Sequence, residues 1–119
     1  MKKIYFEFIN WGEFEKFLEN LPNDEAANLL SLLVKIQEQG ITTSIKMKWI
    51  KKLRSTKNLY EIRSNWRNNI QRVIYFKVSK DRYIITHGFT KKDQKTPLKE
   101  IRKAELRKSK FMKDDNGHG

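Results

Sequence analysis

The chain has 119 residues and no cysteine, which excludes disulfide bonds, thiolate metal sites and a cysteine nucleophile. Its length suits one domain, and a 12% aromatic content supplies apolar surface for one core despite a net charge of +12. The first nine residues hold too short an apolar run for a signal peptide or membrane span, so we expect a cytoplasmic protein with no membrane partner.

The charge is distributed unevenly along the chain. Residues 1–45 hold four Lys and seven acidic residues, a net −3, whereas residues 46–119 hold 22 basic and seven acidic residues, a net +15. A polyphosphate partner suits such a field, because each phosphate that a basic side chain neutralises releases counterions. We therefore expect the second half to bind such a partner, the alternative being a basic surface that serves only solubility.

The first half of the chain predicts one strand and two helices. Apolar residues alternate with polar ones over residues 2–9, which indicates a strand. Helical spacing follows over residues 14–21, with Asn10 as the expected cap, and again over residues 29–36, with Asn23 as the cap and Gly40 just past the end. These helices should form a hairpin on one face of a sheet.

The second half predicts three strands and a helix. Residues 41–57 have a weak pattern and are expected to form a loop that can include a helical turn. Runs rich in Ile, Val, Tyr and Phe at residues 59–64, 69–79 and 82–90 predict an antiparallel meander with hairpin-sized links. Pro97 should begin a final helix, and residues 113–119 should form a disordered polar tail.

The predicted fold class is therefore α+β: a small antiparallel sheet with an amino-terminal strand, a helical hairpin, a β-meander and a carboxy-terminal helix. The expected domain spans residues 1–112. This layout by itself does not identify a function.

Most residue patterns of known enzymes are absent. The chain has no Gly-rich phosphate loop, no His-Glu-x-x-His and no serine in a nucleophile elbow, and the acids of its basic half are scattered. Because hard metal ions need several converging oxygen ligands, we expect neither a metal site nor a cofactor. An RNA-cutting reaction would then use the 2′-hydroxyl of the RNA as its nucleophile.

Three side chains on the predicted strands are candidates for chemistry. Alternation leaves Arg63 on the open side of its strand, either as a phosphate ligand or as a solvated charge. Arg72 lies in a strand that is apolar on both faces, where a charge is costly unless it is paired or opens onto a site. His87 could transfer protons or be a partly buried strand histidine.

Basic and aromatic residues near the strand ends are candidates for RNA contacts. Lys91, Lys92 and Lys95 follow the last predicted strand and could surround a phosphate or form a solvated loop. Trp66, in a tight turn, could stack on a base or cover the hairpin. The residues expected to bind RNA are Lys51, Lys52, Trp66, Lys91 and Lys95.

Three segments resemble a known family. They are residues 59–63 (LYEIR), residues 72–76 (RVIYF) and, most specifically, residues 87–97 (HGFTKKDQKTP). The series resembles the phage-derived HigB branch of the RelE/ParE toxin superfamily. It covers about residues 53–112, whereas residues 1–52 are similar only in the order of their elements.

The resemblance implies a RelE-like fold and the toxin of a type II toxin–antitoxin system. Such a toxin is a metal-free endoribonuclease, an mRNA interferase that cuts messenger RNA on the ribosome and so inhibits translation. By position, the resemblance assigns Arg72 and Lys92 to the charged phosphorane transition state and Arg63 to the scissile phosphate. The carboxy-terminal Tyr of RelE-type enzymes has no match in residues 96–112, which leaves His87 or a lysine as the proton-transfer group.

Partners and alternatives follow from the same resemblance. A HigA-like helix-turn-helix antitoxin is the expected partner, docked on the acidic helical hairpin at Glu15 and Glu19 or else over the basic site. Two other functions remain open at this point: a ParE-like toxin that inhibits DNA gyrase, and a noncatalytic RNA- or ribosome-binding module.

Overall fold

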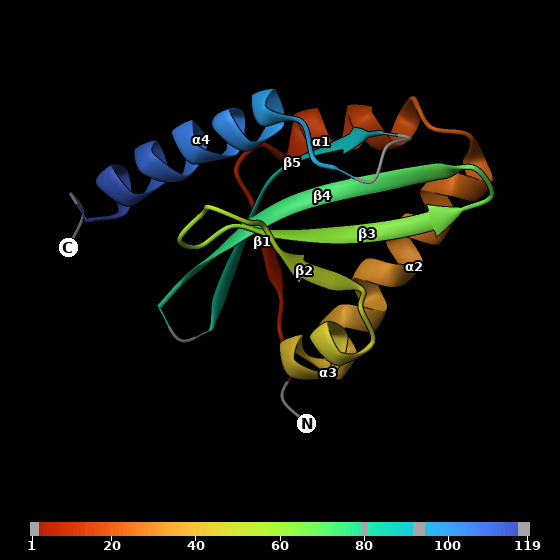
Figure 1. Cartoon of the computed structure of the whole chain (residues 1–119), viewed down its shortest axis with the longest axis horizontal. Coiled ribbons are helices and arrows are strands. Elements are labelled where there is room, and N and C mark those ends of the chain that lie inside the picture. The colour runs from red at the N-terminus through yellow and green to blue at the C-terminus, as the bar shows by residue number, and fades with distance from the viewer. Residues whose placement is uncertain (1–2, 80, 92–94, 117–119) are drawn as a thin grey trace.

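The computed structural model describes residues 3–79, 81–91 and 95–116, and its fold is α+β, as predicted (Figure 1). Five strands form one sheet in the order β1-β5-β4-β3-β2. The elements in chain order are β1 (Phe6–Phe8), α1 (Trp11–Glu19), α2 (Asn23–Gln39), α3 (Ile41–Lys46), β2 (Ile50–Lys52), β3 (Tyr60–Trp66), β4 (Asn69–Val78), β5 (Arg82–Thr90) and α4 (Leu98–Asn116).

The sheet is mixed, whereas the prediction was antiparallel throughout. Strands β2 to β5 pair antiparallel as a meander, but β1 pairs with β5 in parallel, with Phe6 opposite Tyr83. The chain leaves β1 through the helical layer and re-enters the sheet at the far edge through β2. Alternation of side chains predicts a strand but neither its partner nor its direction.

Residues 41–57 are more ordered than the predicted loop. They contain α3, where the Ser44 hydroxyl donates to the Gly40 carbonyl at 2.7 Å, and the short strand β2. Ile50 of β2 is buried and pairs with Ile62 of β3. A three-residue strand is too short to produce a recognisable period, so its location depended on tertiary pairing.

Helix ends were predicted with mixed success. The Asn10 side chain accepts from the Glu13 backbone N–H at 3.0 Å, and Gly40 follows α2 at φ 85°, as expected of a cap and of a glycine terminator. Asn23 is already helical, with Pro22 at the cap position, so that prediction was wrong by one residue. Helix α4 continues to Asn116, four residues past the predicted end.

Two apolar cores lie on opposite faces of the sheet. On one face Phe14 of α1 and Leu29 of α2 pack against the sheet, and on the other face Ala104 of α4 is buried against Phe76. Because both faces are covered, β4 is buried along nearly its whole length. Helix α4 packs over β5 and β4 (Figure 1). Its first turn borders the candidate site.

Candidate nucleic-acid interface

A basic cavity of about 600 Å³ opens between strands β2 and β3 and the chain that leads into α4. Every charged side chain among the described residues that line it is basic, while apolar side chains form part of its wall. The lining residues are Lys51, Lys52, Leu53, Arg54, Ser55, Arg63, Lys95, Thr96, Leu98 and Ile101. This cavity is the candidate interface, because it concentrates positive charge in a concave, partly desolvated place.

A buried polar cluster lies behind the cavity wall. The Glu61 carboxylate accepts from Arg63 Nε at 2.6 Å and from the Thr96 hydroxyl. Arg72 Nη1 lies 3.6 Å from the same carboxylate and donates to Thr96 Oγ1 at 3.3 Å. Glu61 and Arg72 are both fully buried, so each charge depends on the other and on these hydrogen bonds for its solvation.

The cluster fixes the position of Arg63. Arg63 and Arg72 are directly opposite each other on β3 and β4, on the sheet face that α4 covers in part. The Arg63 side chain is 20% exposed, lines the cavity, and is held at its Nε by the buried Glu61 carboxylate. A guanidinium held in this way keeps a fixed orientation beside the cavity, so that contact with a phosphate there would cost little side-chain entropy.

The structure brings four of the predicted residues together at the cavity. Lys51 and Lys52 come from the edge strand β2, Arg63 from β3, and Lys95 from the segment before α4. Lys52 Nζ also donates to the Thr56 carbonyl at 2.6 Å, which holds the loop after β2 against the strand. Cationic residues more than 40 positions apart in the sequence thus line one cavity. A ligand with several phosphates needs such a cluster of cations.

Other predicted residues are placed differently. Arg72 has no exposed surface and contacts Glu61 and Thr96, of which Thr96 lines the cavity, so Arg72 lies behind the cavity wall. Lys91 is half-buried and does not line the cavity; its backbone N–H donates to the Ile70 carbonyl at 3.2 Å. Lys92 lies outside the described residues.

His87 is buried beneath α4 and does not line the cavity. Its side chain is 1% exposed, with Nε2 3.0 Å from a Glu100 oxygen and Nδ1 2.9 Å from the Thr86 hydroxyl. Burial lowers the pKa of His87, and the hydrogen bond that its Nε2 shares with the Glu100 carboxylate opposes that shift only in part. This geometry matches the buried strand histidine that the sequence analysis left as its alternative.

Trp66 anchors the β3–β4 turn to α2. Its Nε1 donates to Asp24 at 2.9 Å, and the Arg67 guanidinium lies 3.6 Å from the same carboxylate. The hydrogen bond to Trp66 is the main cause of the lowered pKa of Asp24. Trp66 therefore covers the hairpin, and it is not among the residues that line the cavity.

The acidic hairpin presents fewer exposed acids than its sequence suggested. Glu15 and Glu19 are exposed on α1, in the layer opposite the cavity. By contrast Glu13 binds Arg107 of α4 at 2.8 and 2.7 Å, and Glu25 is buried and accepts from Gln71 at 3.0 Å. Several of the acids therefore join elements of the fold.

Sequence reasoning missed three residues of this site. Glu61 and Thr96 form the buried cluster with Arg72, and Arg54 lines the cavity. A signal for Glu61 was present, because an acid between Tyr60 and Ile62 in a core strand needs a buried partner. Nothing in the sequence linked it to Thr96, which is 35 residues away.

The described residues contain neither a cluster of metal ligands nor a membrane-spanning helix. Across residues 3–79, 81–91 and 95–116, no three His, Asp or Glu side chains gather where they could hold a metal ion. Within the same ranges, no helix is both long enough and apolar enough to cross a membrane.

Comparison with known proteins gives one match. The model of a family described as Phage derived protein Gp49-like (DUF891) matches residues 16–109, which include β2 to β5, the lining of the cavity and most of α4. No curated protein matches the chain.

Proposed function

Because the chain belongs to the phage-derived Gp49-like family, part of the RelE/HigB-like toxin–antitoxin superfamily, we propose that it is a HigB-type toxin. Its proposed activity is that of an endoribonuclease that cuts messenger RNA on the ribosome, in the cytoplasm, and so stops translation. The family also implies an antitoxin partner. A HigA-like helix-turn-helix protein is the form that we propose for it.

The basic cavity carries this proposal. Five cationic side chains converge on it from three separate segments, and none of the described residues that line it is acidic. Each phosphate contact with a single strand at 0.15 M salt contributes about a 4-fold gain in affinity relative to 1 M salt, because roughly 0.7 counterion is released. A handful of such contacts can therefore hold a single RNA strand in a cavity of this size.

The proposed reaction uses the RNA as its own nucleophile. The 2′-hydroxyl gives its proton to water and attacks the adjacent phosphorus, the bond to the 5′-oxygen breaks, and that oxygen takes a proton from an ammonium group of the cavity. The products are a 2′,3′-cyclic phosphate and a 5′-hydroxyl. Arg63 contacts the scissile phosphate as charge builds on its oxygens, together with Lys92, whereas Arg72 acts as a positioning residue through Glu61.

Proton transfer is assigned to a lysine of the cavity. His87 is buried below α4 and bound to Glu100, so it has no direct path to a phosphate in the cavity. Lys51, Lys52 and Lys95 line that cavity. An ammonium group at this position can give a proton to the leaving oxygen.

The test is RNA cleavage in a translating extract. Purified protein should cut messenger RNA at defined sites and should leave 2′,3′-cyclic phosphate ends. The cleavage step should survive a chelator once the ribosomes' own need for magnesium is controlled for. Arg63→Gln should slow cleavage by about 100-fold or more, by analogy with loss of one transition-state donor. Lys95→Gln serves as a second variant, because Lys95 is exposed and its loss should leave folding intact.

A matched control comes from the opposite layer of the molecule. Lys16→Gln with Lys46→Gln removes two exposed charges on α1 and α3, away from the cavity, and should cleave at the wild-type rate. A 3′-hydroxyl end would contradict the proposed chemistry. RNA binding without any cut product would instead support a noncatalytic module, and arrested gyrase on DNA would support a ParE-like toxin.

The antitoxin is proposed to dock on the helical layer at Glu15 and Glu19. Both side chains are exposed on α1, and the cavity opens on the opposite face of the sheet. A partner bound there would leave the cavity open and would inhibit by its bulk, which would prevent entry into the ribosome. The alternative site, an acidic antitoxin segment in the cavity itself, predicts loss of binding on charge reversal at Lys51 and Lys95.

A further inference from the structure

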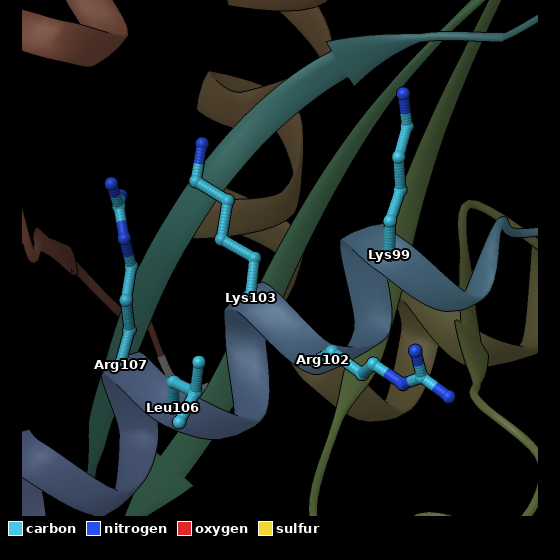
Figure 2. Close-up of a pocket in the computed structure, with 5 residues that line it drawn as sticks. All are labelled: Lys99, Arg102, Lys103, Leu106 and Arg107. Carbon is cyan, nitrogen blue, oxygen red and sulfur yellow. The ribbon is translucent and has the colours of Figure 1, made fainter.

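The outward face of α4 is a second basic surface, separate from the cavity. With 3.6 residues per turn, most positions that face away from the buried Ala104 carry cationic side chains, with Leu106 and Ser109 as the exceptions. Figure 2 shows Lys99 and Lys103 extending side by side from successive turns, with Arg102 on an adjacent side of the helix. The residues of this α4 stripe are Lys99, Arg102, Lys103, Leu106, Lys110 and Lys113.

Most acids of α4 are directed away from this charge, while Asp114, four residues after Lys110, offsets part of it near the end of the helix. Glu100 points toward the sheet, where it holds His87 at 3.0 Å, and Asp115 binds Arg82 at 3.3 Å. Glu105 lies at the margin of the stripe rather than within it, by helical periodicity. Five cations therefore share one side of the helix over 15 residues, a length of about 21 Å at 1.5 Å of rise per residue. One of them, Lys103, also lies 3.9 Å from Glu13 of α1.

The helix that carries the stripe is rigidly attached. Arg107 binds both oxygens of Glu13 on α1 and donates to the Thr86 carbonyl at 2.7 Å, and Phe111 packs against Phe76 of β4. A rigid, straight row of charges matches a partner whose own charges form a regular, rigid array. The backbone of duplex nucleic acid is such an array.

The composition of the stripe favours phosphate over protein as its partner. Cores of protein–protein interfaces are depleted in Lys and enriched in aromatic residues, whereas this face has four Lys, no aromatic residue and one exposed leucine. Lone exposed leucines are ordinary on protein surfaces. We propose that the α4 stripe binds the phosphate backbone of duplex RNA.

This surface extends the molecule's reach beyond the cut strand. The first turn of α4 supplies Leu98 and Ile101 to the cavity wall, while Lys99 and Arg102 turn outward to the stripe. A structured RNA can thus be held along α4 while a neighbouring single strand enters the cavity. The binding is independent of cleavage, so the inference goes beyond the proposed activity and can be tested without it.

The test measures binding of a blunt RNA duplex of about 16 base pairs, the length that known duplex-binding domains span. The variant Lys99→Gln with Lys110→Gln removes two exposed charges from the stripe and keeps good helix formers. At 0.15 M salt, affinity should fall about 30-fold, or 5-fold for each lost phosphate contact, and the slope of log K against log salt should decrease by about two. The control Lys16→Gln with Lys46→Gln carries the same charge change and should bind like the wild type.

Two further variants and probes decide the outcome. Lys51→Gln with Arg54→Gln, in the cavity, should leave duplex binding within a few-fold of wild type while it impairs cleavage. The inference is overturned if the cavity variant loses duplex binding and the stripe variant keeps it. It is also overturned if the stripe variant binds duplex normally but loses affinity for polyglutamate, since the surface would then serve an acidic protein. Failure of cleavage in every variant and in the wild type would contradict only the proposed activity.

Discussion

Replacing Arg72 by methionine should destabilise the protein strongly, because it breaks a fully buried ion pair. Arg72 and Glu61 each have no exposed side-chain surface, and 3.6 Å separates Arg72 Nη1 from the Glu61 carboxylate. Methionine keeps most of the volume of the arginine stem but removes its charge. The Glu61 carboxylate would keep Arg63 and Thr96 as partners and would lose its buried counter-charge.

The magnitude follows from the cost of breaking a buried pair. Removal of one partner of a buried pair typically costs about 3–5 kcal/mol, and the loss here should lie near the lower end because Glu61 keeps Arg63 at 2.6 Å. For a domain of this length, about 4 °C of melting temperature corresponds to 1 kcal/mol, so the midpoint should fall by about 12 °C. Replacing Glu61 by glutamine in the same variant should recover part of the loss, since no carboxylate then stays buried, although Arg63 loses its acidic partner.

Thermal and urea unfolding followed by circular dichroism would measure the effect. Arg82→Met is the matched control: Arg82 also binds two acids, Glu7 and Asp115, but at 39% exposure, so its loss should move the midpoint little. If the unfolding free energy of Arg72→Met lies within about 1 kcal/mol of the wild-type value, the buried pair contributes little to the stability of the fold. A double variant no more stable than Arg72→Met would lead to the same conclusion.

Three other predictions concern packing, pH and the partner. Gly88→Ala should cost about 1–3 kcal/mol in urea unfolding, because its Cβ would lie 2.6 Å from the Phe17 ring; wild-type stability would refute this contact. Burial lowers the pKa of His87, so the stability that its neutral form contributes is present above pH 6.5 and is lost as the pH falls through the lower folded value. The unfolding free energy of the wild type should therefore fall more steeply from pH 7 to pH 5 than that of His87→Gln, and equal slopes would contradict the assignment. Charge reversal at Glu15 and Glu19 should weaken antitoxin binding in titration calorimetry, and unchanged affinity would place the antitoxin elsewhere.

Much of the fold could be predicted from local pattern. The bounds of β5 agree with the predicted strand at residues 82–90, and the cap at Asn10 and the glycine after α2 follow from backbone chemistry at helix ends. The parallel edge strand β1 and the short strand β2 were not predictable in the same way. Both depend on pairing with strands far along the chain, which leaves no local period.

The site shows the same division between local and long-range information. Net charge and its concentration after residue 45 determined that a basic surface exists in the second half, because charge adds without regard to fold. Sequence alternation also placed Arg63 on the open side of its strand, and it does line the cavity. Only the tertiary structure decided that Arg72 is buried with Glu61, and that His87 lies under α4. The physical reason is that the Coulomb and desolvation energies of a charged side chain depend on its distance to other charges and on its burial. Both are set only when the sheet and helices have packed.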